Sequence, residues 1–268
     1  MALNQTRLNR AVQVRHVFEH NLAHEFAVIR QVAETYQYVT IDTEFPGLVY
    51  QTTAHPRDLS PEQRYSLVKA NVDNLKLIQL GLTLSNRHGD NAITWEFNFR
   101  GFDPMTDLHA PTSIQLLKSQ GIDFWKNYTQ GVDPDRFAYL FWSSGLPCNS
   151  NKIWITFHGA YDIAFLMKLI MSRQQLPDQM HVFFYLVTAY FGRDVFDVKH
   201  LIKSCNGLYG GLENVAKLLK VERVVGRAHN AGSDSLLTWA IYNKMLKIFF
   251  KEGIEARHAQ ILCGMQEL

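Results

Sequence analysis

The segment Tyr38–Phe45 constrains the fold more than any other part of the chain. Its β-branched and aromatic residues predict a strand, and Pro46-Gly47 ends it. Asp42 and Glu44 are two residues apart, so their side chains point to the same face of that strand. The other face carries Val39, Ile41, Thr43 and Phe45. The chain must therefore bury this strand while holding together two carboxylates that repel each other and favour a cation.

Further strands predict the rest of the sheet. Leu77–Leu84 and Ile93–Phe99 flank a turn-rich stretch at 86–91, which is typical of an antiparallel hairpin. Two later strands, Ile153–Phe157 and Val195–Val198, alternate with helical segments. This order predicts an α/β fold in which helices flank a mixed β-sheet. No linker rich in Pro, Gly or Ser divides the 268 residues, so we expect a single domain.

Apolar spacing predicts the helices. They are expected over Val14–Tyr36, Pro61 to about Val72, several short stretches between Ser113 and Ser144, Asp162–Met171, Met180–Tyr190, from Val198 to Cys205, Leu212–Leu219 and Asp234 to about Lys251. Residues 1–13 are interpreted as an N-terminal tail and residues 14–268 as the domain. A transit peptide is the alternative for the first residues, because three arginines precede the first acid.

Composition excludes some classes of protein and leaves others open. The net charge of +2 does not indicate binding to nucleic acid by charge alone. No apolar run is long enough to span a membrane. Cys148, Cys205 and Cys263 are far apart, which is typical of free thiols in a reducing compartment. We therefore expect a cytoplasmic or nuclear protein without a membrane partner.

Two more acids and a histidine stand where predicted elements begin. Asp162 follows a buried strand at the start of a helix, and Asp234 starts the long helix with Ser233 as a possible N-cap. His229 lies five residues before Asp234, in a loop. An aspartate that merely stabilises a helix N-terminus would explain each acid taken alone. The set of five is what points to chemistry.

Together these side chains are typical of a hydrolytic metal site. Hard ions such as Mg²⁺ and Mn²⁺ prefer oxygen ligands, which four carboxylates provide. Two such ions can clamp a phosphodiester, and a histidine with a pKa near neutral can take the proton from water. His158 is a second candidate histidine, but we interpret it as structural because it directly follows a strand.

The order of these residues resembles the DEDD nucleases of the histidine subtype. Longer stretches resemble the Caf-type deadenylase subunit of the CCR–NOT complex, and the likeness runs from about Val14 to the C-terminal region. They are Ile41–Gly47, Asn71–Leu82, Asp197–Cys205 and Ala231–Thr238.

This resemblance implies an RNase H-like fold and the removal of AMP from the 3′ end of mRNA poly(A) tails. It also implies two divalent ions, Mg²⁺ or Mn²⁺, and a complex with a scaffold and a second deadenylase subunit. By position, Asp42, Glu44 and Asp234 would bind one ion, and Asp42 would bridge to the second. Asp162 would support the second ion, and His229 would be the general base.

Two other functions remain open from the residues. The first is a DEDD exonuclease that acts on DNA ends or other RNA ends. The second is a scaffold subunit without catalysis, against which the five intact residues speak. Two segments are also ambiguous: Phe45 could stack on the terminal base or pack in the core, and the apolar run His181–Phe191 could meet a partner or be buried.

Overall fold

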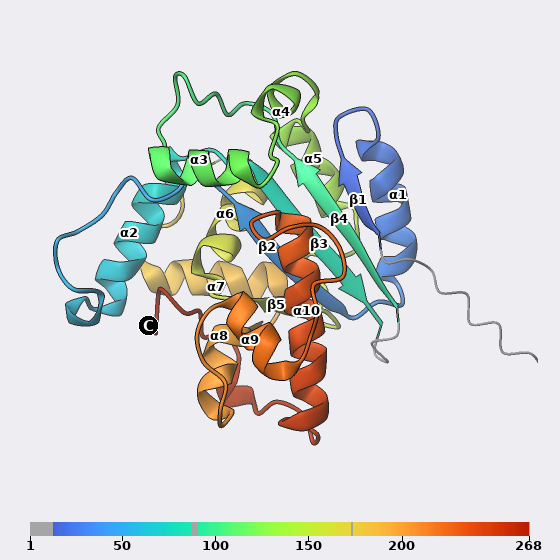
Figure 1. The fold of residues 1–268 in the computed structure, drawn as a ribbon, viewed down its shortest axis with the longest axis vertical. Helices are drawn as coiled ribbons and strands as arrows, with labels where there is room; N and C mark the ends of the chain where they lie inside the picture. Colours follow the sequence, from blue (N-terminus) through green and yellow to red (C-terminus); the bar gives the residue numbers. More distant parts are fainter. Residues whose placement is uncertain (1–12, 87–90, 173, 268) are drawn as a thin grey trace, which may run out of the picture.

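A mixed sheet forms the centre of the molecule (Figure 1). The computed structural model describes residues 13–86, 91–172 and 174–267, and over these residues the sheet has six strands in the order β1-β4-β3-β2-β5-β6. The strands are β1 (Val14–Val17), β2 (Tyr38–Glu44), β3 (Gln79–Ser85), β4 (Ala92–Asn98), β5 (Ile153–Thr156) and β6 (Val195–Asp197).

Pairing in the sheet is of both kinds. β3 pairs antiparallel with both β2 and β4, which confirms the predicted hairpin. The pairs β1–β4, β2–β5 and β5–β6 are parallel. β2 therefore lies inside the sheet, as its composition predicts, and the α/β class is confirmed.

Helices cover both faces of this sheet (Figure 1). Their bounds are α1 (Leu22–Ala33), η1 (Pro56–Asp58), α2 (Pro61–Asn74), α3 (Pro111–Ser119), α4 (Phe124–Gln130), α5 (Pro134–Trp142), α6 (Ala160–Ile170), α7 (Met180–Phe191), α8 (Val198–Leu201), η2 (Ile202–Ser204), α9 (Leu212–Leu219), α10 (Ala231–Ile248) and η3 (Ala256–His258). Within this described part of the chain, none of the helices is long and apolar enough to cross a membrane.

The first predicted helix is wrong in its N-terminal part. Val14–Val17 is a strand at the edge of the sheet, where Val14 pairs with Thr94, and the helix begins only at Leu22. Val14, Val17 and Phe18 are all buried, and their spacing of three and four residues imitates a helical face. A four-residue strand is too short for alternation to reveal it. The predicted tail, residues 1–13, lies almost wholly outside the described residues.

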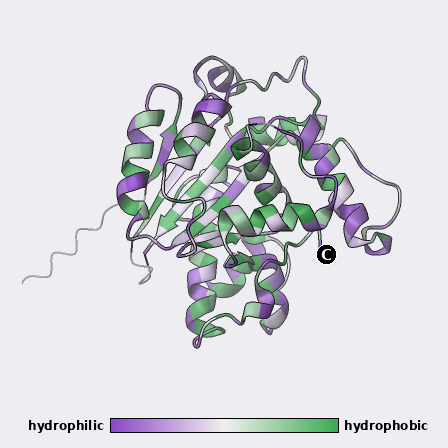
Figure 2. Cartoon of the chain, turned by 180° about the vertical axis from the view of Figure 1, so that it is seen from behind, coloured by the Kyte–Doolittle hydropathy of each residue, from purple (hydrophilic) through white to green (hydrophobic). Residues whose placement is uncertain are grey.

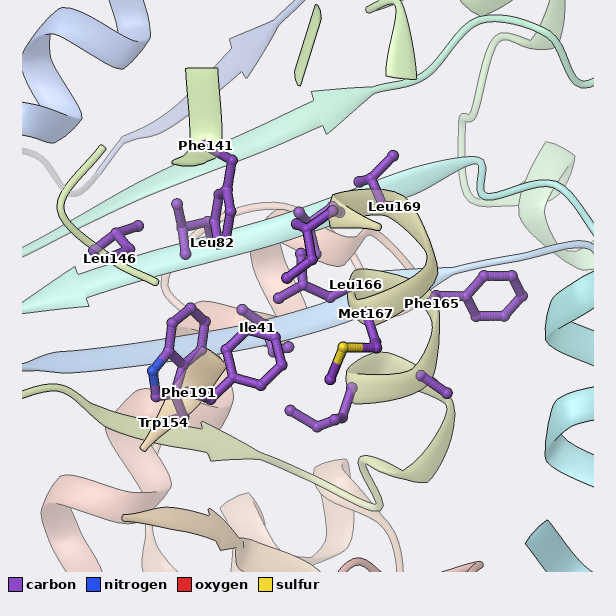
Figure 3. Packing of buried hydrophobic residues seen from close by; sticks show 14 of the residues in the cluster. Ile41, Leu82, Phe141, Leu146, Trp154, Phe165, Leu166, Met167, Leu169 and Phe191 are labelled. Carbon is purple, nitrogen blue, oxygen red and sulfur yellow. The ribbon is translucent and has the colours of Figure 1, made fainter. Parts of the chain in front are cut away.

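Two apolar clusters hold the layers together. In the larger one, Ile41, Leu82 and Trp154 from three neighbouring strands pack beneath Leu166 and Met167 of α6 (Figure 3). The smaller one joins β5 and β6 to α8, α9 and α10 on the other face. α10 also packs across β2, β3 and β4. β2 is thus enclosed between α6 and α10, and both helices carry a candidate acid.

The apolar run at 181–191 belongs mostly to the core. It forms α7, which is hydrophobic along most of its length when seen from behind (Figure 2). Phe183, Val187 and Phe191 are buried, whereas Tyr185 on the opposite side is 72% exposed. Burial in the core therefore explains most of this segment.

Gly81 permits the close approach of α10 to the sheet. It lies on β3 directly across from Asp42 in the antiparallel register. A methyl group on Gly81 would lie 1.8 Å from the carbonyl oxygen of Ala231 and 2.7 Å from the amide nitrogen of Gly232. Only a residue without a side chain fits between β3 and the first turn of α10, so Gly81 sets how near α10 comes to β2.

Replacing this glycine should therefore be costly. We expect Gly81→Ala to lower the free energy of unfolding by about 3 kcal/mol, because the backbone of α10 must move away from β3. Chemical denaturation measures this loss. Gly211→Ala is the matched control, since Gly211 has a φ of −88° and no atom within 4 Å of an added methyl group. Similar small losses in both variants would contradict this account of the packing.

Candidate active site

Asp42 and Glu44 lie at the end of β2, on the side that α10 covers. Asp42 is opposite Gly81 and Glu44 opposite Gln79 in the register with β3. Burial raises the pKa of both carboxyls well above their usual range, and the nearby Asp162 and Asp234 raise them further. The sequence predicted this pair to be buried and mutually repelling, and the structure shows the same electrostatics.

Asp162 reaches the same place from the opposite layer. It lies in the first turn of α6, and its Oδ1 accepts a hydrogen bond of 2.5 Å from the Thr43 hydroxyl on β2. Burial raises the pKa of Asp162 to about 7, although the hydrogen bond from Thr43 lowers it. Thr43 therefore ties the start of α6 to the strand that carries the other two acids.

Asp234 comes from α10, whose beginning differs from the prediction. The helix starts at Ala231 with Asn230 as its N-cap, so the expectation that Ser233 caps it is wrong. The first amides are satisfied from the sheet instead: Ala231 donates to Gln79 Oε1 at 3.3 Å and Gly232 to Glu96 Oε2 at 3.2 Å. Capping from two strands is invisible to local sequence patterns, because the partners are more than 130 residues away.

Both oxygens of Asp234 have partners within the protein. Oδ1 pairs with the guanidinium of Arg223 at 2.6 Å, and Oδ2 accepts the backbone N–H of His229 at 3.0 Å. Arg223 also contacts Glu213 of α9 and the hydroxyl of Ser233. Asp234 is thereby fixed in orientation, and its carboxylate holds the loop that carries His229.

A compact set of possible metal ligands results. Ligand atoms of Glu44, His229 and Asp234 all lie within 4.8 Å of one another. The resemblance placed Asp42 with Glu44 and Asp234 on one ion and made His229 the general base; the structure brings the His229 ring next to Glu44 and Asp234. Glu44 and Asp234 raise the pKa of Asp42, and Asp162 raises that of both Asp42 and Glu44, so the four acids lie close together. Carboxylate oxygens suit Mg²⁺ or Mn²⁺, and buried acids with raised pKa values gain from a cation, so these residues fit such ions.

Comparison with known proteins identifies the family. Residues 17–136 match the CAF1 family ribonuclease. A relative from Arabidopsis thaliana, probable CCR4-associated factor 1 homolog 7, is 44% identical over 263 residues, which cover 95% of this chain and 94% of the relative. The chain belongs to the CAF1 ribonuclease family.

Solved structures of CAF1-family proteins agree with this fold. Pop2p of Schizosaccharomyces pombe, in its Mg²⁺- and Mn²⁺-bound form, has a TM-score of 0.87 and 38% identity, and the match covers 94% of this chain and 99% of that one. Yeast CAF1 co-crystallised with the NOT1 MIF4G domain has a TM-score of 0.76 and 32% identity, covering 98% of this chain and 100% of that chain. The RNase H-like fold implied by the resemblance is confirmed.

Two residues that support this candidate site were not found from the sequence. Arg223 was missed because it lies eleven residues before Asp234, in a loop with no regular spacing. Asp197 was also missed. It is buried and accepts hydrogen bonds from four backbone amides, those of His158, Gly159, Lys199 and Cys263. Its place at the end of a short apolar strand was the available signal. His158, with a φ of 61°, is held by this carboxylate, which supports a structural role.

Phe45, the possible base-stacking residue, is half-buried. Its ring stacks on Tyr161 at 5.2 Å between centroids and packs against Phe165 at 4.9 Å. Both neighbours belong to α6. The CAF1-family core therefore holds the ring next to Glu44, with part of its surface still accessible.

Proposed function

We propose that this chain is a deadenylase: a 3′-to-5′ exoribonuclease that shortens mRNA poly(A) tails by hydrolysis and releases 5′-AMP. The observation that carries the proposal is the convergence of Asp42, Glu44, Asp162 and Asp234 beside His229, from three separate elements. A relative in S. pombe, 38% identical over 255 residues, is named poly(A) ribonuclease pop2, which supports the choice of substrate.

The four carboxylates would hold two divalent ions, Mg²⁺ or Mn²⁺. Bound ions would neutralise the charge of the phosphodiester, make water more acidic and stabilise the leaving 3′-oxygen. Glu44 and Asp234 would supply ligand oxygens beside the His229 ring, and Asp42 and Asp162 complete the acidic lining. The Mg²⁺- and Mn²⁺-bound relative supports this choice of ions.

We propose His229 as the general base of the reaction. Its side chain is exposed while its backbone N–H is fixed to Asp234, so the ring can face water and the scissile phosphate. The imidazole would accept the proton of the attacking water, which needs a group that is neutral near pH 7. The bond between phosphorus and the 3′-oxygen of the shortened RNA breaks as a new bond forms between phosphorus and the water oxygen. The phosphate stays on the released 5′-AMP.

The proposal also places the chain within a complex. Yeast CAF1 was co-crystallised with NOT1, and the Arabidopsis relative is called a CCR4-associated factor. We infer a scaffold subunit and a second deadenylase as partners, single-stranded RNA as substrate, and mRNA turnover in cytoplasm and nucleus as the setting. Residues 14–268 would form the ribonuclease domain.

Substrate choice tests the proposal. The protein should shorten an RNA that ends in twenty adenosines faster than the same RNA with twenty cytidines or uridines, and faster than the matching DNA. The rates are compared at equal substrate concentration with Mn²⁺. Equal rates on all tails would still support a DEDD nuclease but would refute its preference for poly(A). A faster rate on DNA would instead support the alternative of a DNA exonuclease.

A further inference from the structure

An open groove adjoins the loop that carries His229. Its volume is about 940 Å³, and it lies between α3, α4 and the segment that follows β4. Figure 1 shows α3 and α4 together at one end of the molecule. The floor is a small separate apolar cluster that contains Phe102, Ile114, Ile122 and Phe124. The same cluster contains Ile78, which directly precedes β3, so the floor of the groove packs next to the sheet.

Two exposed aromatic rings line the groove. Trp125 is 74% exposed and Tyr128 is 52% exposed, and both are on α4. Their rings are nearly parallel, with centroids 6.2 Å apart and planes inclined by 20°. A large side chain that leaves most of its surface in water contributes little to folding, so the exposed rings are available to a ligand.

The groove is continuous with the active-site loop. Gly121 lines it, and a methyl group built on Gly121 would come within 3.9 Å of the guanidinium of Arg227. The neighbouring Gln120 carbonyl accepts a weak bond of 3.5 Å from Asn230, the N-cap of α10. Arg227 is two residues from His229. A strand with its 3′ end at the carboxylates therefore meets this groove next.

Charged side chains of both signs lie at the groove. Lys118 is exposed and lines it, and the exposed Arg227 lies beside Gly121 at its edge. Asp103 and Asp123 also line the groove, but each accepts a bond from a nearby backbone amide, that of Met105 at 2.8 Å and of Lys126 at 2.9 Å. The two exposed rings offer stacking surfaces for flat bases, and Arg227 offers a cation to a phosphate beside the active-site loop.

We propose that this groove holds the single-stranded RNA upstream of the scissile bond, with bases stacked on Trp125 and Tyr128. This inference rests on the proposed function, and it adds a second site to it. Stacking on aromatic rings accepts any base, so the groove contributes affinity and does not select adenine. Its contribution is absent for RNAs too short to reach it.

Binding of short and long RNA tests the inference. Fluorescein-labelled oligoadenylates of three and twelve nucleotides would be titrated with Asp42→Asn protein and with the same protein carrying Trp125→Ala. We expect Trp125→Ala to raise the Kd of the twelve-nucleotide RNA about tenfold and to leave that of the trinucleotide within about twofold. Trp125→Phe keeps a ring and should retain most of the affinity.

The control is Tyr185→Ala, which removes a ring of similar exposure from α7. An unchanged Kd for the long RNA in both Trp125→Ala and Tyr128→Ala would overturn the inference and leave the groove for a protein partner. Failure of the wild type to shorten any RNA would instead refute the proposed function. Shortening by the wild type together with an unchanged Kd would refute only the groove.

Discussion

Asp42→Asn should abolish RNA shortening and, at the same time, stabilise the metal-free protein. Asp42 lies among three other acids, and burial together with these neighbours raises its pKa. The neutral asparagine removes one negative charge from that set, so the free energy of unfolding without metal should rise at pH 7.5. The same change removes a ligand oxygen that the ions need, and we expect a loss of about 10³-fold in rate.

The measurement combines denaturation with chelator present and the initial rate with Mn²⁺ present. Asp194→Asn is the matched control, because Asp194 is an exposed aspartate that precedes β6, outside the cluster. It should change neither quantity. Loss of both stability and activity in Asp42→Asn would mean that Asp42 holds the fold together, which would contradict the electrostatic account. Retained activity would remove Asp42 from the metal site.

The second large effect is on the pH dependence of stability without metal. Burial raises the pKa of Asp162 from 3.8 to about 7, so the folded protein keeps a proton that the unfolded chain loses near pH 4. The contribution of Asp162 to the free energy of unfolding then falls as pH rises from about 4 to about 7. Three units correspond to about 4 kcal/mol at ~1.36 kcal/mol per unit.

The difference between wild type and Asp162→Asn reports this contribution. Asparagine can still accept the hydrogen bond from Thr43. It also relieves the repulsion by which Asp162 raises the pKa of Asp42 and Glu44, and this adds to the difference in the same direction. We expect the wild type to lose about 4 kcal/mol more than the variant between pH 4.5 and pH 7.5, with chelator present. Added Mn²⁺ should stabilise the wild type more at pH 7.5 than at pH 5.5, since the ion and protons compete for the carboxylates. Parallel stability curves for the two proteins would refute the raised pKa.

The acidic core of the site was predictable because its signals are local. Asp42 and Glu44 lie on one face because side chains of a strand alternate, and Asp162 and Asp234 lie in the first turns of α6 and α10. Each of these facts needs only a few consecutive residues. The order of strands and helices, likewise, was enough to predict a mixed sheet.

What the sequence did not reveal depends on contacts between distant segments. Arg223 meets Asp234 only because a loop folds back on α10, and Glu96 caps α10 from a strand 136 residues away. The edge strand at Val14–Val17 looks helical until β4 supplies its partner. Such features are set by tertiary packing, which local propensity does not describe.

The most direct test of the central claim is the decay of a 5′-labelled RNA that ends in twenty adenosines, first with chelator and then with Mn²⁺ restored. The account predicts no decay with chelator, and after Mn²⁺ is restored a ladder that shortens by one nucleotide at a time from the 3′ end, with 5′-AMP as product. Decay that persists in chelator would contradict a metal-dependent site. No shortening by folded wild type with Mn²⁺ would contradict catalysis by this chain alone and would support a scaffold role.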